Sequence, residues 1–310
     1  MMKFNKIYSL LIFGFILSIL LIIGLSFKKF ISLNNSINRP LDRDHSQLRQ
    51  KNLKDGDPMT VVLYGIDDDA QRHQENLGQR SDSIVLMSIN PKDNKTVMVS
   101  VPRDTRTEIV GHNSTEKLNH AYAYGGPKMA VNSLEKLMDV PVDHYIAINM
   151  DGVKTVVDEI GGVDITSDAT FTTKSTIPFH FEKGKQYHMD GKHALAYMRA
   201  RKEEGAGGDG GRQLRQQQVI TAVAKEAFSM NSVTKLNSIF KAAQDNLRTD
   251  LSFIELNKFR SDYSKADNNV ERLIIDGQND KGDDGLYYFY PNKDSLNEVK
   301  QKLKDNLEIK

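Results

Sequence analysis

The chain has 310 residues, enough for one large globular domain or two small ones. With 42 Lys and Arg residues against 41 Asp and Glu, the formal net charge is +1, so no overall field attracts nucleic acid, and we expect no nucleic-acid partner. The absence of cysteine excludes disulfide frameworks, thiolate metal sites and cysteine nucleophiles. Any anion-binding site must therefore be local.

The N-terminal region contains an uncharged apolar segment at residues 7–27, behind a short tail of residues 1–6. At about 1.5 Å per residue, a helix of this length spans the roughly 30 Å hydrocarbon layer of a membrane. Lys28 and Lys29 follow directly, where a cleavage site would need small residues, so we predict an uncleaved signal anchor. Lysines flank both ends of the segment and leave its orientation open. Residues 28–57 are polar and predict a juxtamembrane linker before a folded domain at residues 58–310.

The folded domain alternates between strand and helix patterns. Apolar β-branched runs predict strands at 60–66, 83–89, 96–101, 144–150 and 272–275. Helical spacing predicts helices at 127–138, from Asp151 to the Gly161-Gly162 pair, at 191–200, 212–230, 231–248 and 252–265, and from Asp294 onward. Strands interspersed with helices predict an α/β fold in which a mixed central sheet lies between helices, preceded by the single transmembrane helix.

Two charged segments lie at predicted strand ends. Asp67, Asp68 and Asp69 follow the first strand, and Arg80 and Asp82 precede the second. Loops at strand ends of α/β folds commonly hold ligands. The alternative is a solvated acidic turn that binds no ligand, which would show the same residue pattern. Arg103 and Asp104 follow a proline at the end of the third strand, where the alternative is a surface ion pair.

Two further segments surround a glycine-rich stretch. Arg199 and Arg201 end a predicted helix, and residues 205–211 then contain five glycines and Asp209. Such a loop either lets backbone amides approach a phosphate or is only flexible. Arg212, Arg215 and Gln216 begin the next helix and share a face. Cations at a helix N-terminus oppose the helix dipole, which suggests an anionic ligand between them.

The clustered arginines and aspartates are suited to phosphoryl transfer. The planar guanidinium group of arginine bonds two phosphate oxygens at once, and carboxylate oxygens suit a divalent ion such as Mg²⁺. In phosphoryl transfer, metal and arginines together neutralise the charge of the transferring and leaving groups. No Gly-x-Ser-x-Gly elbow, Walker phosphate loop, His-Glu-x-x-His pair or Rossmann fingerprint is present in the sequence.

The order of these motifs resembles the LytR-CpsA-Psr family, with a staphylococcal type of sequence, over roughly residues 59–230. The motifs that carry the resemblance are Gly65-Ile66-Asp67, Arg80-Ser81-Asp82-Ser83, Val101-Pro102-Arg103-Asp104-Thr105, Lys117-Leu118-Asn119-His120-Ala121-Tyr122, Ile160-Gly161-Gly162-Val163-Asp164, Arg199-Ala200-Arg201 and Asp209-Gly210-Gly211-Arg212 with Arg215-Gln216-Gln217. The resemblance implies an α/β/α fold with a hydrophobic pocket for a polyprenyl chain, in an extracytoplasmic domain behind one membrane anchor. It also implies transfer of a teichoic acid or capsule precursor from undecaprenyl diphosphate to peptidoglycan.

The resemblance also implies residue roles. Asp67 and Asp82 match the magnesium ligands, although Asp68 and Asp69 leave the choice among the three neighbouring aspartates open. The diphosphate-binding residues that the resemblance implies are Arg80, Arg103, Arg199, Arg201, Arg212 and Gln216. The catalytic residues that it implies are Arg80, Arg103 and Asp209. We expect a lipid tunnel between the helices at 127–138 and 213–228. Two alternatives remain at this point: a pyrophosphatase acting on the same lipid, and a non-catalytic lipid-binding regulator.

Overall fold

The computed structural model describes residues 36–309 except 44, 68–78, 175–177, 230–237, 240, 253–254, 257, 259–262 and 264–268. A central six-stranded sheet has the order β11-β6-β1-β2-β3-β12. Its strands are β1 (Met59–Asp67), β2 (Arg80–Asn90), β3 (Lys95–Ser100), β6 (His144–Asn149), β11 (Leu247–Thr249) and β12 (Val270–Ile274). The pairs β1–β6 and β3–β12 are parallel and the other pairs antiparallel, so the predicted mixed sheet is confirmed.

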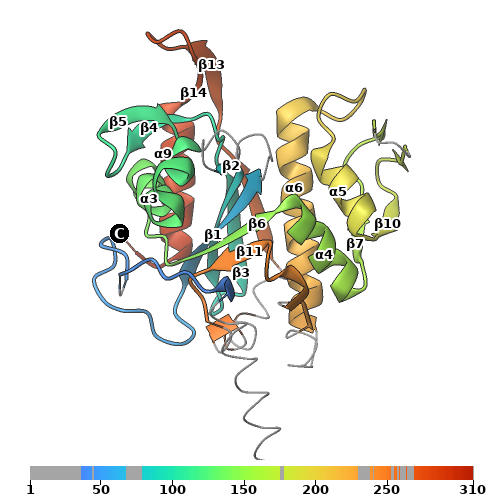
Figure 1. The fold of residues 1–310 in the computed structure, drawn as a ribbon, viewed down its shortest axis with the longest axis horizontal. Coiled ribbons are helices and arrows are strands. Elements are labelled where there is room, and N and C mark those ends of the chain that lie inside the picture. Colours follow the sequence, from blue (N-terminus) through green and yellow to red (C-terminus); the bar gives the residue numbers. More distant parts are fainter. Residues whose placement is uncertain are drawn as a thin grey trace, which may run out of the picture.

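Helices cover both faces of this sheet, which gives the predicted three layers (Figure 1). On one face lie α3 (His120–Met138) and α9 (Lys293–Asn306), whose apolar residues pack in the main core with Val62, Leu86 and Val99. On the other face lie α4 (Met150–Ile160), α5 (Gly191–Arg199) and α6 (Gly208–Ser229). Successive residues of a strand point to opposite faces of the sheet. Because helices cover both faces, most strand positions are apolar.

Four small two-stranded sheets lie outside the central sheet. They pair β4 (Arg106–Ile109) with β5 (Ser114–Lys117), β7 (Val163–Thr166) with β10 (Gln186–Met189), β8 (Phe171–Thr172) with β9 (His180–Phe181), and β13 (Gly277–Lys281) with β14 (Tyr287–Pro291). None of the four was predicted, because each strand is short and most lack a clear alternation of apolar and polar residues.

Several helix boundaries differ from the predictions. Helix α3 begins at His120 and passes through a kink at Gly125 and Gly126, whose backbone angles are not helical. The N-cap of α4 is Asn149, whose side chain accepts from the amide of Gly152, and not Asp151. The predicted helix at 231–248 is wrong at its end, because residues 247–249 pair with β6 as a strand. Most of the predicted helix at 252–265 lies outside the described residues.

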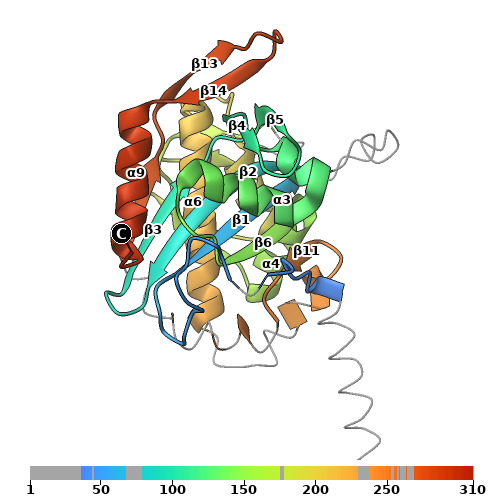
Figure 2. The ribbon, with the colours of Figure 1, turned by 90° about the vertical axis from the view of Figure 1, so that its left-hand side faces the viewer.

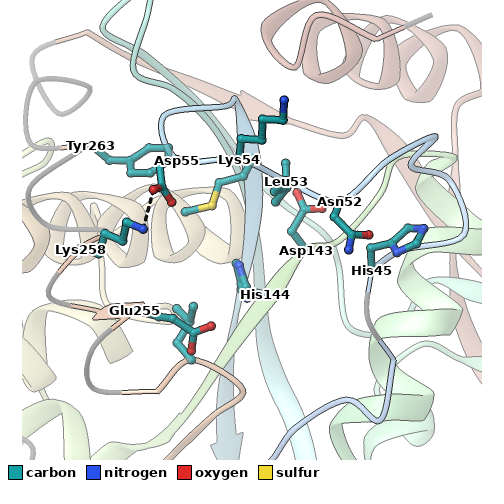
Figure 3. Close-up of a pocket in the computed structure, with 12 residues that line it drawn as sticks. His45, Asn52, Leu53, Lys54, Asp55, Asp143, His144, Glu255, Lys258 and Tyr263 are labelled. Atoms are coloured by element: carbon teal, nitrogen blue, oxygen red, sulfur yellow. Dashed lines mark ion pairs between the residues drawn. The ribbon is translucent and has the colours of Figure 1, made fainter.

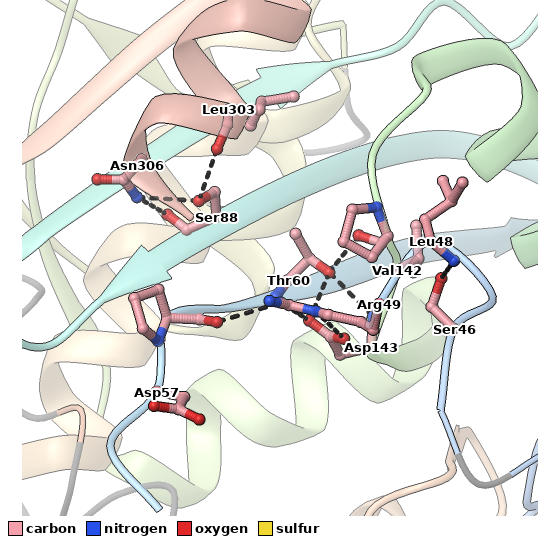
Figure 4. Close-up of polar contacts among 12 residues, drawn as sticks. Ser46, Leu48, Arg49, Asp57, Thr60, Ser88, Val142, Asp143, Leu303 and Asn306 are labelled. Carbon is pink, nitrogen blue, oxygen red and sulfur yellow. Dashed lines mark hydrogen bonds and ion pairs between the residues drawn. The ribbon is translucent and has the colours of Figure 1, made fainter. Parts of the chain in front are cut away.

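The segment before β1 is packed onto the domain. Ile37 and Leu41 are buried, and Asn38 forms an isolated parallel bridge with Thr249 of β11. Arg49 forms an ion pair of 2.5 Å with Asp143, which also accepts from Thr60 at the start of β1 (Figure 4). The described part of the predicted linker is therefore held by apolar packing and buried ion pairs rather than free in solvent.

The described residues contain no helix that is long and apolar enough to cross a membrane. The predicted membrane span at residues 7–27 lies outside the described residues. The signal anchor therefore stays a prediction from the sequence.

Candidate functional site

The first predicted residues lie at one end of the central sheet, where β1 ends, β2 begins and β3 ends. Asp67 at the end of β1 lies opposite Arg80 at the start of β2. Asp82 occupies the extra position of a β-bulge, where the pairing shifts between Gly65 and Ile66, and bulges redirect side chains at such sites. A Cβ atom on Gly65 would lie 2.9 Å from the Cβ of Ser83, so the bulge requires glycine there. The side chain of Asp67, with Asp68 and Asp69, falls outside the described residues, so the metal-ligand prediction remains open among them.

Arg103 extends from the loop after β3 toward these strands. Its Nη1 lies 2.7 Å from Oδ2 of Asp82, and its Nε lies 3.5 Å from Oδ2 of Asp104, which also pairs with Lys117 at 2.9 Å. Burial lowers the pKa of Arg103, but the carboxylates of Asp82 and Asp104 outweigh it, and the pKa is raised. The side chain stays about one third exposed, at 34%. Arg103 is thus a permanent cation with one face open to a ligand.

The glycine-rich loop contributes a second group of charges. Asp209 accepts from Nη2 of Arg201 at 2.6 Å and lies 2.7 Å from Nη2 of Arg212. Burial is the main cause that lowers the pKa of Arg212; Asp209 and Asp82 act against it, and the positive charges of Arg201 and Arg103 add to it. Arg103 and Arg201 therefore each lie close enough to Arg212 for their charges to act on it. Such mutual repulsion is relieved when an anion binds between them.

The Nε atom of Arg212 is buried and has no hydrogen-bond partner among the described residues. An unpaired buried donor costs about 1–3 kcal/mol, which an incoming oxygen acceptor would recover. The same guanidinium group keeps its ion pair with Asp209. Arg212 therefore combines an anchored orientation with a donor available for a ligand.

Helix α6 begins at Gly208, four residues before the predicted start. Asp209 therefore lies in the first turn, where a carboxylate suits the helix dipole, and the expected conflict with Arg212 is largely removed. A Cβ on Gly211 would lie 2.1 Å from the carbonyl oxygen of Ala206, so this glycine permits close packing of the loop.

Arg215 has a different role from Arg212, although the sequence placed both on one face. Its side chain is fully buried and donates to the carbonyl oxygens of Tyr197 at 3.2 Å, Ala200 at 2.6 Å and Ala206 at 2.8 Å. Its Nη1 lies 3.4 Å from a carboxylate oxygen of Asp168. Arg215 is therefore a structural residue that holds the glycine-rich loop against α6.

Two glutamines attach α6 to the sheet beside the arginines. Gln216, a predicted diphosphate ligand, is buried and accepts from the hydroxyl of Ser83 at 2.9 Å. Gln217 is fully buried and donates to Ser100 at 2.9 Å. Gln217 and Ser83 were not assigned to the site from the sequence, although both belong to motifs that carry the family resemblance. Gln216 positions α6 next to Asp82, which is the neighbour of Ser83.

Arg199, a predicted diphosphate-binding residue, makes no described contact with the other arginines of the site. It is the last residue of α5, its side chain is exposed, and no ion pair or hydrogen bond joins it to the arginine cluster within the described residues. Arg80 lies at the expected strand end and acts electrostatically on Tyr124 of α3. We use the term arginine cluster for Arg80, Arg103, Arg201 and Arg212.

Three partly buried apolar side chains lie on the face of the central sheet opposite to α3 and α9. Leu63 lies opposite Val85 and Ile146, and Val85 lies opposite Ser100, the residue bonded to Gln217 of α6. Leu63, Ile146 and Met87 are only partly buried although they lie on central strands. They pack against two small clusters of buried residues, Leu63 and Ile146 with Ile148 and Leu247, and Met87 with Val61 and Ile89, and each keeps part of its surface exposed.

The predicted tunnel needs one correction. Helix α3 packs in the main core with Val62 and Leu86, whereas α6 packs with α5 and β7 on the other side of the sheet. Because the sheet lies between them, the two helices do not line a common channel. The part of the prediction that involves α6 remains compatible with the partly exposed face at Leu63.

A cavity of about 330 Å³ lies elsewhere on the domain (Figure 3). It is lined by His144, Asp143, Met59, Glu255 and Tyr263, with other residues of the segment before β1. Met59 and His144 are the first residues of β1 and β6, so the cavity lies at the opposite end of β1 from Asp67. Nine extended residues separate these ends by roughly 25–30 Å. The cavity is therefore separate from the arginine cluster.

Comparisons with known proteins identify similar sequences and similar folds. The family model described as LytR_cpsA_psr family matches residues 25–305. A relative from Bacillus mycoides, named polyisoprenyl-teichoic acid–peptidoglycan teichoic acid transferase TagU, is 38% identical over 277 residues, covering 89% of this chain and 88% of the relative. The crystal structure of B. subtilis TagU has a TM-score of 0.66 and 35% identity, covering 82% of this chain and 98% of that one. A structure of TagT bound to LIIa-WTA has a TM-score of 0.71 and 31% identity, covering 88% of this chain and 100% of that one.

Proposed function

Because this chain belongs to the LytR-CpsA-Psr family, we propose that it is a phosphotransferase that moves an anionic glycopolymer from a polyprenyl diphosphate to peptidoglycan. Wall teichoic acid or a capsule precursor is the proposed polymer, and undecaprenyl diphosphate its carrier. The observation that carries the proposal is the arginine cluster at the sheet end, which lies beside the partly exposed apolar face at Leu63. A diphosphate head and an apolar tail need such a pair of neighbouring surfaces.

The proposed reaction is an in-line displacement at phosphorus. A hydroxyl of the acceptor, which we propose to be the 6-hydroxyl of a muramic acid residue, attacks the phosphate that bears the glycopolymer. A new O–P bond forms, the bond to the bridging oxygen breaks, and polyprenyl phosphate leaves, while the hydroxyl proton passes to a base. We propose that Arg103 and Arg212 bond the non-bridging oxygens, where negative charge grows in the transition state; their ion pairs with Asp82 and Asp209 support this role by orienting both guanidinium groups.

We propose Mg²⁺ as the cofactor, held by Asp82 and one of the aspartates at 67–69. The donor chemistry fits, because Mg²⁺ at phosphate sites is commonly bound by one or two carboxylates with substrate oxygens and water completing the octahedron. Asp82 stays partly exposed while its Oδ2 pairs with Arg103, and so can receive a ligand. When bound, the ion neutralises charge on the leaving phosphate.

Product analysis tests the proposal. The full chain in detergent is incubated with a defined lipid-linked oligosaccharide and Mg²⁺, with and without peptidoglycan oligomers, and the products are identified by mass. We expect a phosphodiester-linked conjugate that forms only with the acceptor. Free oligosaccharide phosphate formed equally with and without acceptor would indicate the pyrophosphatase instead. Absence of turnover despite donor binding would favour a non-catalytic lipid-binding regulator.

The polyprenyl tail is proposed to occupy the sheet face beneath α6. Replacing Leu63 with tryptophan should fill this space and lower the affinity for lipid-linked donor at least tenfold, because a bulky ring removes room for the chain. Leu48→Trp, at a leucine that is 44% exposed before β1, is the matched control. Titration of a fluorescent polyprenyl diphosphate measures both. Equal affinity of the two folded variants would contradict this location.

The domain is proposed to lie outside the cytoplasm, because its acceptor belongs to the wall. Protease added to intact, wall-stripped cells is therefore expected to digest residues beyond the anchor. Immunoblotting against a C-terminal tag measures the loss, with a cytoplasmic protein as the control. Digestion only after permeabilisation would contradict both the topology and the wall function.

A further inference from the structure

The hairpin β13–β14 projects above the end of the central sheet where β3 ends (Figures 1 and 2). Its two strands pair in the register Gly277–Pro291 to Lys281–Tyr287, and residues 282–286 connect them. A two-stranded ribbon is only marginally stable in water by itself, so its conformation depends on its attachments to the domain.

Two sets of contacts fix the hairpin next to the arginine cluster. The amide of Phe289 donates to the carbonyl of Asp104 at 2.9 Å, and Thr105 forms a parallel bridge with Phe289. Asp104 is the residue that follows Arg103 and pairs with it. The hairpin is thus bonded directly to the backbone of the loop that positions Arg103.

The opposite face of β14 is also held. Tyr288 is buried, its ring lies 5.8 Å from the guanidinium carbon of Arg106 and 5.9 Å from Nζ of Lys117, and its hydroxyl donates to Asp284. Lys117 in turn pairs with Asp104. With both faces of β14 attached, the outer part of the hairpin is presented in one orientation, and a pre-organised surface binds with a smaller entropy cost.

The outer part of the hairpin combines an exposed ring with polar groups. Tyr287 is 59% exposed and Leu286 50%, the largest exposed fractions among large apolar side chains in the described part of the chain. All five residues of β13 are exposed, and the side-chain amide of Asn279 lies on the same face of the hairpin as Lys281 and Tyr287. Lys281 places its ammonium 5.5 Å from the centre of the Tyr287 ring. We call Asn279, Lys281, Leu286 and Tyr287 the hairpin tip.

The chemistry of the hairpin tip fits a sugar chain better than other ligands. An aromatic ring can cover the C–H face of a pyranose, while an amide and an ammonium bond its hydroxyl and acetamido groups. A protein partner would require a wider contiguous apolar patch than one tyrosine and one leucine. Asp280, Asp283 and Asp284 surround the tip and would repel both an anionic lipid surface and a polyanionic donor polymer. The remaining ligand class is the amino-sugar glycan of the acceptor.

We infer that the hairpin tip is the docking site of the acceptor glycan, which Tyr287 holds by stacking so that a sugar hydroxyl reaches the arginine cluster. This inference rests on the proposed function, since it assigns the acceptor of that reaction to a surface. It goes further by separating two binding surfaces, with the donor diphosphate on the arginines and the acceptor sugars on the hairpin tip. Tyr287 is a binding residue in this scheme and takes no part in the chemical step.

Glycan titration in the absence of donor tests the inference. The full chain in detergent is titrated with soluble β-1,4-linked oligomers of N-acetylglucosamine and N-acetylmuramic acid. Stacking of one ring is worth about 1 kcal/mol, so Tyr287→Ala should weaken binding about fivefold, whereas Tyr287→Phe should stay close to the unmodified protein. Leu286→Ser should weaken binding less than Tyr287→Ala, and Leu48→Ser, at an exposed leucine before β1, should leave it unchanged. Equal affinities of Tyr287→Ala and the unmodified protein would overturn the inference.

Transfer kinetics give a second readout. Tyr287→Ala should raise the KM for the glycan acceptor and leave the KM for the lipid donor unchanged. A rise in the donor KM alone would assign the hairpin tip to the polymer of the donor and overturn the inference. If the unmodified protein binds glycan through Tyr287 but transfers nothing, the proposed reaction fails while the docking site stands. If transfer proceeds and Tyr287→Ala changes neither KM, the docking site fails while the reaction stands.

Discussion

Replacement of Arg103 with alanine is expected to lower turnover by about two orders of magnitude while the domain remains folded. Removing a donor that stabilises charge in a transition state costs about 3 kcal/mol, which is roughly a hundredfold in rate. Arg103 is about one third exposed, and its partners Asp82 and Asp104 are also accessible to water, so its removal leaves no buried charge unpaired. Turnover of lipid-linked donor and the thermal unfolding temperature should be measured on the same preparation.

Lysine at the same position separates charge from geometry. Arg103→Lys restores the positive charge but presents one ammonium in place of two parallel donors, so only part of the rate should return. Arg199→Ala serves as the comparison, because Arg199 is exposed and no described contact joins it to the arginine cluster, and its effect should be much smaller. Normal turnover by folded Arg103→Ala, or a large drop in its thermal stability, would show Arg103 to be a structural ion-pair partner.

Replacement of Arg215 with methionine is expected to destabilise the domain by about 3–5 kcal/mol, because it removes one partner from a buried ionic network. The carbonyl oxygens of Ala200 and Ala206 would lose the donor that binds both, and Asp168 would lose its nearby cation. Methionine retains much of the side-chain volume, so the effect reports polar interactions more than a cavity. Urea unfolding followed by circular dichroism measures the free energy of unfolding.

Arg212→Met is the matched control for this prediction. Arg212 lies three residues earlier on α6, is 22% exposed and makes its described ion pair with Asp209 alone. This variant should have reduced turnover with a much smaller decrease in stability. The opposite pattern, in which Arg215→Met keeps its stability and loses turnover, would show that Arg215 contacts the substrate.

The contrast between Arg212 and Arg215 shows how far the sequence predicts the site. Residues three apart share a helix face, and periodicity alone therefore groups them. Their roles diverge because the loop at 200–207 folds back over α6, so that carbonyl groups from this loop and from α5 point at Arg215. Asp168, which completes that network, lies 47 residues away in the chain, and no local pattern could have associated it with α6.

The fold itself was largely predictable where long apolar runs occur. The strands β1, β2, β3, β6 and β12 and the helices α5 and α9 lie close to their predicted positions because they are strongly apolar, periodic or capped. The strand β11 was wrongly predicted as helix. Its three residues adopt the strand conformation because they pair with β6, which no local pattern indicates. The hairpin β13–β14 was missed because β13 is wholly polar and is held through β14 by interactions with distant residues of β4 and β5.

Because the segment from Ile37 to Arg49 packs onto the domain, the folded unit begins before residue 58, the boundary predicted from the sequence. The bridge between Asn38 and Thr249 covers the outer side of β11, the last strand at that edge of the central sheet. An uncovered edge strand presents unpaired amide and carbonyl groups to which another chain can add a strand. A shortened protein that begins at residue 58 would expose this edge together with the carboxylates of Glu135 and Asp143, which lose Arg43 and Arg49. Such a protein would self-associate through its sheet edge, whereas one that begins at residue 36 keeps the edge closed.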